Sequence, residues 1–381
     1  MRYLIATIRD KLGGGRFKLQ SIEQHLEAAA AWLARAQDAT PDDGVAHSYD
    51  IKLGRWHASY PETTGYIIPT LYDYAQHYQQ PEYAERALRM ARWEAREQLL
   101  EGGVRAGRMD AEVVVPTIFN TGQVLFGWTR AWIESGDETL RTALVKAADW
   151  LVAAQDADGC WRRFSSPFSS RSINPYNTRS AFALAQAGVA LEKQHYIDAA
   201  VANVSWALGT AQDNGWIPDN CLSEAETAII HTIAYTIRGI FEVGAIAGRE
   251  DFIACGQDMA RKVISNQRQD GSLPGSLTPR WQPGNTRWTC VTGNSQMAIN
   301  WMRLSHITGD KTLVEHARRI NCFNRSLQDL ATAHPGIRGA MAGSYPINGD
   351  YMRFRYPNWA TKFFMDGLML EMSEGRPLKR I

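Results

Sequence analysis

Three acidic residues of this 381-residue sequence stand in segments rich in glycine and aromatic residues. Glu62 belongs to PETTGY, Asp219 follows a Gly-Trp turn, and Asp350 lies in SYPINGDYMRFRYPNW. Hydrolysis of a glycosidic bond needs two carboxyl groups, one protonated and one ionised. We therefore predict a catalytic pair of Glu62 with Asp219 or Asp350, although a single carboxylate in such a segment is more often a structural hydrogen-bonding group. Other acidic residues of these segments are Asp110, Glu112, Glu224 and Glu226.

His231 is a second candidate for proton transfer, because an imidazole titrates close to neutral pH. With a tyrosine it could abstract the proton beside a uronate carboxylate, while an arginine neutralises that carboxylate, as a lyase requires. With a second histidine it could serve a sugar epimerase. Candidate partners are Tyr176, Tyr345, Tyr351, His47, His57 and His334. A hydrogen-bonded core histidine is the structural alternative.

Aromatic, asparagine and arginine side chains in the same segments could bind a sugar. Aromatic rings offer flat apolar faces, and amides and guanidinium groups bind hydroxyls or carboxylates. The predicted substrate-binding residues are Trp56, Tyr66, Asn120, Tyr176, Asn177, Arg179, Trp216, Trp288, Asn294, Tyr345, Tyr351 and Trp359. Further arginines here are Arg105, Arg108, Arg171, Arg280, Arg287, Arg353 and Arg355. Most of the aromatic residues are expected to pack beneath loops, and some arginines to pair with loop carboxylates.

A repeat of nearly sixty residues positions these segments. Glutamines in similar turns, best preserved in AQDADGCW and AQDNGW, occur at 37, 98, 155, 212, 267 and 328. An amphipathic helical segment precedes each turn, and a segment that is apolar all round follows it. A helix that is apolar all round must be covered on every side, so this alternation predicts an outer ring of helices around an inner ring. The approximate repeats of one domain are 21–79, 80–135, 136–194, 195–249, 250–309 and 310–373.

The connections between helices differ in length, which indicates that the candidate residues gather on one face of the ring. Links from inner to outer helices are short and polar, whereas links from outer to inner helices are long and hold the candidate residues. Threonines at matching helix starts predict N-caps, and helix N-termini that converge on one mouth would favour anionic ligands. These threonines are Thr64, Thr121, Thr178, Thr232 and Thr292. An open solenoid is the competing architecture, but six closed hairpins bury both ends without capping repeats.

Two resemblances follow from these segments. The spacing of Gln155, Gly159 and Trp161 resembles the repeat motif of squalene and hopene cyclases, which are six-hairpin (α/α)6 toroids. PETTGY, HTIAYTIRG, TGNSQMAINW and YPNWATKFF resemble a poorly characterised toroid family associated with bacterial polysaccharide gene clusters. The first resemblance implies an all-α (α/α)6 toroid, and the second implies carbohydrate chemistry.

Composition and missing motifs disfavour several other functions. Lys and Arg number 41 against 40 Asp and Glu, so the charge offers little attraction to nucleic acid. The five cysteines form no CxxC pair, and we expect no metal and no cofactor. Asp42 and Asp43 lack the further acids of DxDD or DDxxD motifs, which makes isoprenoid cyclisation unlikely.

Targeting signals are also not recognised. Charged residues Arg9, Asp10 and Lys11 interrupt the short apolar stretch near the start, unlike a signal peptide. The most apolar long window contains Arg238 and Glu242, which suits a helix inside protein better than one in lipid. We therefore expect a cytoplasmic protein without an integral membrane segment, and the sequence does not predict its oligomeric state.

The preferred interpretation is a glycoside hydrolase acting on a bacterial polysaccharide or oligosaccharide, with uronate-containing ones as candidates. A polysaccharide lyase or sugar epimerase that uses His231 and a tyrosine is the first alternative. A noncatalytic glycan-binding or scaffold protein of polysaccharide biosynthesis is the second.

Overall fold

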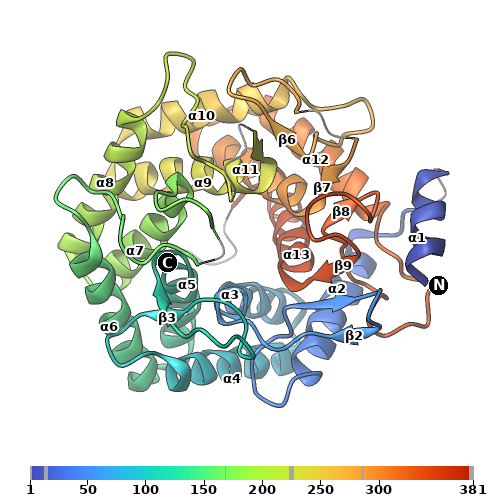
Figure 1. Ribbon diagram of the computed structural model, residues 1–381, viewed down its shortest axis with the longest axis horizontal. Coiled ribbons are helices and arrows are strands. Elements are labelled where there is room, and N and C mark those ends of the chain that lie inside the picture. Colours follow the sequence, from blue (N-terminus) through green and yellow to red (C-terminus); the bar gives the residue numbers. More distant parts are fainter. Residues whose placement is uncertain (1, 13–15, 168, 223–226, 285–286, 377–381) are drawn as a thin grey trace.

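The computed structural model describes residues 2–12, 16–167, 169–222, 227–284 and 287–376. Helices dominate these residues and form two concentric rings (Figure 1). The outer helices are α2 (Ile22–Asp38), α4 (Pro81–Glu97), α6 (Glu138–Ala154), α8 (Gln194–Gly209), α10 (Glu250–Ile264) and α12 (Thr312–Arg325). The inner helices are α3 (Pro61–Tyr78), α5 (Ile118–Ser135), α7 (Thr178–Ala190), α9 (Ile230–Ala247), α11 (Val291–Thr308) and α13 (Asn358–Met372).

Burial follows the two sequence patterns. Outer helix α6 buries the stripe that contains Leu140, Leu144 and Leu151, and its other face is exposed. Inner helix α9 is buried over most of its circumference, because the outer ring covers one side and the other inner helices cover the rest. None of the helices in the described ranges combines the length and the hydropathy needed to cross a membrane.

The inner helices form a closed ring. Each packs against the next, and α13 packs against both α2 and α3, so the last hairpin returns to the first (Figure 1). An open solenoid would leave its two ends apart. The predicted (α/α)6 toroid is therefore confirmed.

The repeated glutamines join neighbouring hairpins. Gln155 Nε2 donates to the carbonyl of Gly159 in its own turn and to that of Ala199 in the next outer helix, both at 2.9 Å. The last of these bridges closes the ring, because Gln328 Nε2 donates to the carbonyl of His25 at 3.2 Å. Gln37, Gln98 and Gln267 make the same two kinds of bond. The near-sixty-residue spacing thus reflects one hydrogen-bonded joint, which we call the glutamine joint.

The prediction that these threonines cap the inner helices is wrong for all five, because the N-cap residues are Tyr60, Thr117, Asn177, Ile229 and Cys290. Thr64 lies one turn inside α3, where its hydroxyl donates to the carbonyl of Tyr60 and accepts from the amide of Val45, both at 2.9 Å. Thr121 accepts from the amide of Val104 at 2.9 Å in the same way. These hydroxyls fasten the long connection to the inner helix and so fix the residues between them.

Short antiparallel strands within the long connections are an addition to the all-α prediction. Strand β1 (Ser48–Asp50) pairs with β2 (Arg55–Trp56) and with β9 (Arg355–Pro357), so the last long connection is joined to the first. The remaining pairs are β3 (Val104–Arg105) with β4 (Pro116–Thr117), β5 (Ala228–Ile229) with β6 (Ser276–Leu277), and β7 (Thr289–Cys290) with β8 (Ser344–Tyr345). Helix α1 (Arg2–Lys11) lies outside the rings (Figure 1), where Asp10 Oδ2 accepts from the amide of Ile347 at 2.9 Å.

Candidate functional site

Glu62 lies in the first turn of α3, at the end of the ring where the long connections enter the inner helices. The hydroxyl of Tyr60 donates to Glu62 Oε2. Burial raises the pKa of Glu62 to about 7, and the bond from Tyr60 opposes this shift. The side chain still keeps some exposed surface. A carboxyl group that is half protonated near neutral pH and reachable from solvent can act as an acid or a base.

Tyrosines surround this carboxyl group. They come from the start of α3, from the 3-10 helix η1 (Pro175–Asn177), from α9 and from the connection between β8 and β9. Burial raises the pKa of each, and the charge of Glu62 contributes to the increase. These residues are Tyr60, Tyr66, Tyr176, Tyr235 and Tyr351. We call them, with Glu62 and His231, the Glu62 cluster; its phenols are neutral at physiological pH.

His231, in the first turn of α9, borders the same tyrosines. Its ring centroid is 4.6 Å from that of Tyr235 and 5.2 Å from that of Tyr351. Burial lowers the pKa of His231 to about 4, opposed by a 2.8 Å bond between Nδ1 and Gln296 Oε1. The imidazole is thus neutral at physiological pH. Donation from Nδ1 to the amide oxygen leaves the lone pair on Nε2 available to a substrate or water.

Two histidines and two arginines lie on the side of the cluster beside Tyr60. The ring of His47 is 5.3 Å from that of Tyr60, and His57 Nδ1 is 3.0 Å from Arg108 Nη1. Burial and the charges of Arg108 and Arg355 lower the pKa values of both histidines. Both guanidinium groups are themselves paired, Arg108 with Asp110 at 2.8 Å and Arg355 with Asp50 at 3.2 Å, so an anionic ligand here would have to exchange with these carboxylates.

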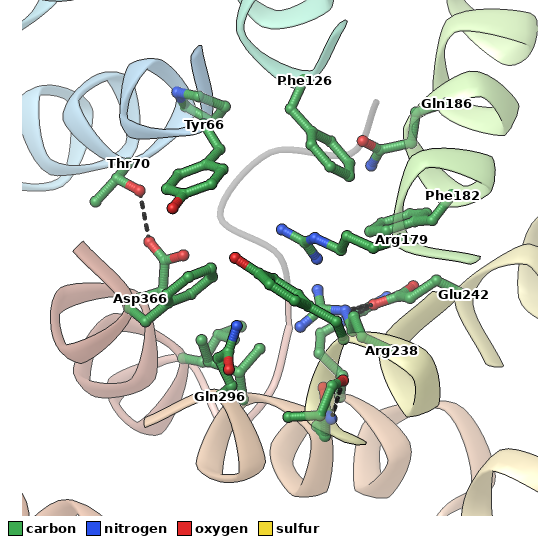
Figure 2. A pocket seen from close by; sticks show the side chains of 18 of the residues that line it. Tyr66, Thr70, Phe126, Arg179, Phe182, Gln186, Arg238, Glu242, Gln296 and Asp366 are labelled. Atoms are coloured by element: carbon green, nitrogen blue, oxygen red, sulfur yellow. Dashed lines mark hydrogen bonds and ion pairs between the residues drawn. The ribbon is translucent and has the colours of Figure 1, made fainter. Parts of the chain in front are cut away.

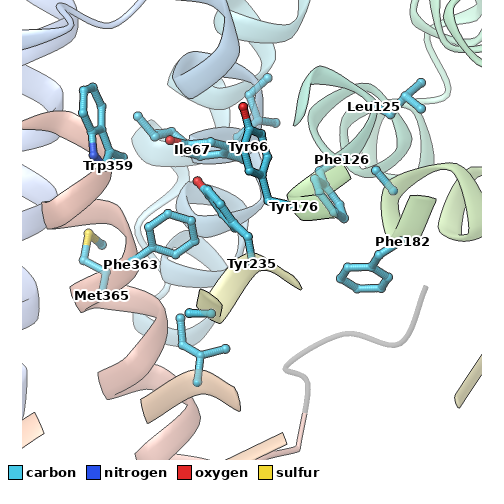
Figure 3. Packing of buried hydrophobic residues seen from close by; sticks show 14 of the residues in the cluster. Tyr66, Ile67, Leu125, Phe126, Tyr176, Phe182, Tyr235, Trp359, Phe363 and Met365 are labelled. Atoms are coloured by element: carbon cyan, nitrogen blue, oxygen red, sulfur yellow. The ribbon is translucent and has the colours of Figure 1, made fainter. Parts of the chain in front are cut away.

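A cavity of about 600 Å³ lies inside the inner ring, and Tyr66 and Tyr235 are among the residues that line it. Figure 2 shows this cavity with Tyr66 at its edge. The residues that line it run from the first turns of the inner helices to their last turns, at Val189, Ile246 and Ile307. The cavity therefore reaches the end of the ring where the connections are short, opposite to the end that holds Glu62. The rings of Tyr66, Tyr235 and Phe363 gather between the two ends (Figure 3).

Charged side chains line this central cavity. Five are cationic, namely Arg130, Arg179, Arg238, Arg303 and Lys362, and three are carboxylates, namely Asp73, Glu242 and Asp366. Glu242 pairs with both Arg238 and Arg303, at 2.7 and 2.9 Å. Asp366 pairs with Lys362, and Asp73 with Arg130. Within the described part of the chain, Arg179 is the lining cation without an ion-pair partner.

Several predicted site residues meet in or beside the Glu62 cluster. Glu62, His231, Tyr176 and Tyr351 belong to it, and Trp359 Nε1 donates to the hydroxyl of Tyr351 at 2.9 Å. Tyr66 borders both the cluster and the cavity, whereas Arg179 lies in the cavity.

The predicted carboxylate pair is not assembled among the described residues. Asp219 is an exposed partner of Arg171, and Asp350 is an exposed partner of Arg353 at 3.0 Å. Neither contributes to the pKa shift of Glu62. Each is held at the surface by its own arginine, so proximity in sequence to aromatic residues did not bring it to the site. Glu224 and Glu226 lie outside the described residues.

The remaining predicted residues pack within the loops and helix starts. They are Trp56, Asn120, Asn177, Trp216, Trp288, Asn294 and Tyr345. The ring of Trp56 is 5.2 Å from that of Trp32, and the ring of Trp216 is 5.1 Å from that of Trp281. Asn120 Nδ2 donates to the carbonyl of Arg105 at 2.9 Å. These contacts match the structural alternative given for such residues.

Sequence reasoning did not select Tyr60, Tyr235 or Gln296, nor most of the charged residues of the cavity. The sequence did contain a signal for the charged residues of the cavity. Arg238 and Glu242 are four residues apart in a helix that is otherwise apolar, and Lys362 and Asp366 repeat this spacing. Charged side chains on a covered helix must face each other or a polar space, and the axis of the ring is that space.

Comparison with known proteins identifies the fold. No family model and no curated protein matches the sequence. Among solved structures, the unsaturated glucuronyl hydrolase from Bacillus sp. GL1 has a TM-score of 0.73 at 16% identity, over 93% of this chain and 98% of its own. An unsaturated glucuronyl hydrolase specific for heparin gives 0.73 at 16%, over 92% and 97%. The cellobiose 2-epimerase from Bacillus thermoamylovorans B4167 gives 0.71 at 11%, over 91% and 97%.

The chain adopts the (α/α)6-toroid fold. At these identities the likeness establishes the shape of the scaffold, and the choice of reaction has to come from the residues that the scaffold positions.

Proposed function

We propose that this protein is a carbohydrate-active enzyme, a glycoside hydrolase acting on uronate-containing oligosaccharides, with Glu62 as the proton donor. The observation that supports it most is the Glu62 carboxyl group, whose pKa of about 7 leaves it protonated in part at neutral pH while it remains in reach of solvent. Unsaturated glucuronyl hydrolases share the scaffold. Arg108 and Arg355 act on the pKa of the neighbouring His47 and are paired with Asp110 and Asp50; they would bind the uronate carboxylate by exchanging these partners.

In the proposed reaction the protonated Glu62 gives its proton to the oxygen of the leaving group as the C–O bond breaks. The hydroxyl of Tyr60 then stabilises the carboxylate that remains, because it already donates to Oε2. Water adds to the sugar carbon, and its proton returns to Glu62 or passes to Nε2 of His231. A neutral His231 thus takes the place of the second carboxylate, which the described residues do not supply beside Glu62.

An epimerase is the second candidate, and one observation favours it. Among the described residues, Glu62 and His231 border the same tyrosines and no second carboxylate joins them, which suits removal and return of one proton at a sugar carbon. In that reaction Glu62 would act as a base. A cellobiose 2-epimerase shares the scaffold as well.

Product analysis and pH dependence separate these reactions. We would incubate the protein with saturated and unsaturated uronate-terminated oligosaccharides, measure new reducing ends, and follow solvent deuterium incorporation. Hydrolysis gives reducing ends and a rate that falls above about pH 7, because Glu62 loses its proton. Epimerisation gives deuterium without cleavage and a rate that falls below about pH 7. New unsaturated-uronate absorbance would instead indicate a lyase, and binding without any product would indicate the scaffold alternative.

Replacing Glu62 by glutamine should lower turnover by about 10²–10⁴-fold, the usual contribution of a general acid or base. Glu82→Gln is the matched control, since Glu82 is exposed on outer helix α4. Turnover of the Glu62→Gln variant equal to that of the control would overturn the proposed role.

A further inference from the structure

The central cavity contains a buried guanidinium without an ionic partner. Arg179 is 7% exposed, and its guanidinium carbon lies 4.5 Å from the ring centroid of Phe126 and 5.6 Å from that of Tyr235. Its Nε donates a long hydrogen bond of 3.4 Å to Gln123 Oε1. The guanidinium points into the cavity (Figure 2). Aromatic faces attract a cation, but they do not neutralise its charge.

The place of Arg179 on its helix increases the need for an anion. It is the second residue of α7, where the helix dipole presents partial positive charge. Burial lowers the pKa of Arg179, which reflects the cost of holding its charge away from water. A negative group bound at the guanidinium would offset both effects.

The other charges that face the cavity leave it positive. Glu242 is shared by two arginines, Asp366 neutralises Lys362, and Arg130 pairs with Asp73 and also with Glu134 behind the lining. With Arg179 added, the lining has five cations against three carboxylates. The excess is concentrated on the side of α7, α9 and α11, where Arg179, Arg238 and Arg303 lie.

Access to the cavity comes from the end of the ring with short connections. Val189, Ala245 and His306 are lining residues with exposed surface at this end. Tyr66 and Tyr235 lie between the cavity and Glu62. A ligand could therefore enter without passing the Glu62 cluster, and the volume of about 600 Å³ suits a small molecule.

We propose that the central cavity is a second binding site, which takes a mono- or disaccharide bearing one carboxylate or phosphate group, with that group on Arg179. The rings of Phe126 and Phe182 supply apolar faces for the sugar, and Gln186 and Asn300 supply amides for its hydroxyls. The site is separate from the proposed reaction and does not depend on it. It shares Tyr235 and Gln296 with the surroundings of His231, so occupancy could be sensed there.

Calorimetric titration at low ionic strength tests the site, with glucuronate, glucose 6-phosphate, inorganic phosphate and glucose as probes. We expect at least one anionic sugar to bind and glucose to bind at least tenfold more weakly. The ratio of glucuronate to glucose 6-phosphate distinguishes a carboxylate from a phosphate ligand. Equal binding of glucose, or no binding of either anionic sugar, would overturn the proposal.

Variants assign the binding to Arg179. Arg179→Gln should weaken the anionic sugar at least tenfold, whereas Arg141→Gln, exposed on outer helix α6, should leave it unchanged. Arg179→Lys keeps the charge and should give an intermediate affinity, which provides a second test if the glutamine variant does not fold. Glu62→Gln should abolish turnover without changing this affinity. Unchanged binding in both Arg179 variants would overturn the assignment.

Discussion

Two buried glutamates at opposite ends of the inner ring have opposite pKa shifts. Burial raises the pKa of Glu62 to about 7, because no cation of the described residues offsets it at this carboxyl group. Burial also opposes ionisation of Glu242, but Arg303 and Arg238 outweigh it and bring the pKa to about 2. The same side chain on the same scaffold is therefore a proton carrier at one end and a fixed charge at the other. The charged partners of a carboxyl group, rather than how deeply it is buried, decide whether its pKa rises or falls.

The comparison predicts that Glu242 contributes to stability. Glu242→Gln would leave Arg238 and Arg303 buried without their shared carboxylate, so the free energy of unfolding should fall by about 3–5 kcal/mol. Urea unfolding near neutral pH measures this, with exposed Glu82→Gln as the control. A change below about 1 kcal/mol would show that the two arginines find other partners.

Glu62 should have the opposite effect on stability, and only above acidic pH. Its folded pKa of about 7 is raised from an unfolded value near 4.5, so stability is greatest below pH 4.5 and declines as pH rises through 7. The decline is at most about 3 kcal/mol. Glu62→Gln should therefore stabilise the protein at pH 8 but not at pH 4. Parallel stability curves for wild type and variant between these pH values would contradict the raised pKa.

Tyr60 should have a smaller effect, on the pKa of Glu62. Its hydroxyl favours the ionised form of the carboxyl group, so Tyr60→Phe should raise the pKa of Glu62 further, by about one unit or less. The pH at which the rate changes would move upward by the same amount. A shift to lower pH would mean that the hydroxyl does not donate to Glu62 during the reaction.

Much of the fold could be predicted from the sequence, because the glutamine spacing and the alternating helix patterns report on contacts that every hairpin repeats. Strands of two or three residues and helix α1 were missed, because such short strands show no alternating pattern and α1 precedes the first repeat. Some of the pairings also join distant segments. Ser48–Asp50, for example, pairs with residues more than 300 positions later.

The site was predicted less completely. Glu62 and His231 were found because both stand in the first turn of an inner helix, where the fold fixes the side-chain direction. Asp219 and Asp350 lie in irregular connections, where the sequence does not indicate direction, and the structure shows them paired with arginines at the surface. The central cavity was missed because candidate residues were sought in the long connections. The charged residues within the apolar inner helices were the signal that indicated it.

The glutamine joints also determine where the ring would first open transiently. Most neighbouring hairpins are also linked covalently by the polypeptide chain. If the glutamine hydrogen bonds between them break transiently, the chain keeps the hairpins close and the bonds re-form. At the joint of Gln328 with α2 no covalent path runs alongside, and the junction is held by noncovalent contacts alone, which include this bridge, the β1–β9 pairing and the packing of α13 on α2 and α3. The ring therefore has one junction without a covalent link, between the Gln328 turn and α2. Hydrogen exchange of backbone amides should be fastest at this junction.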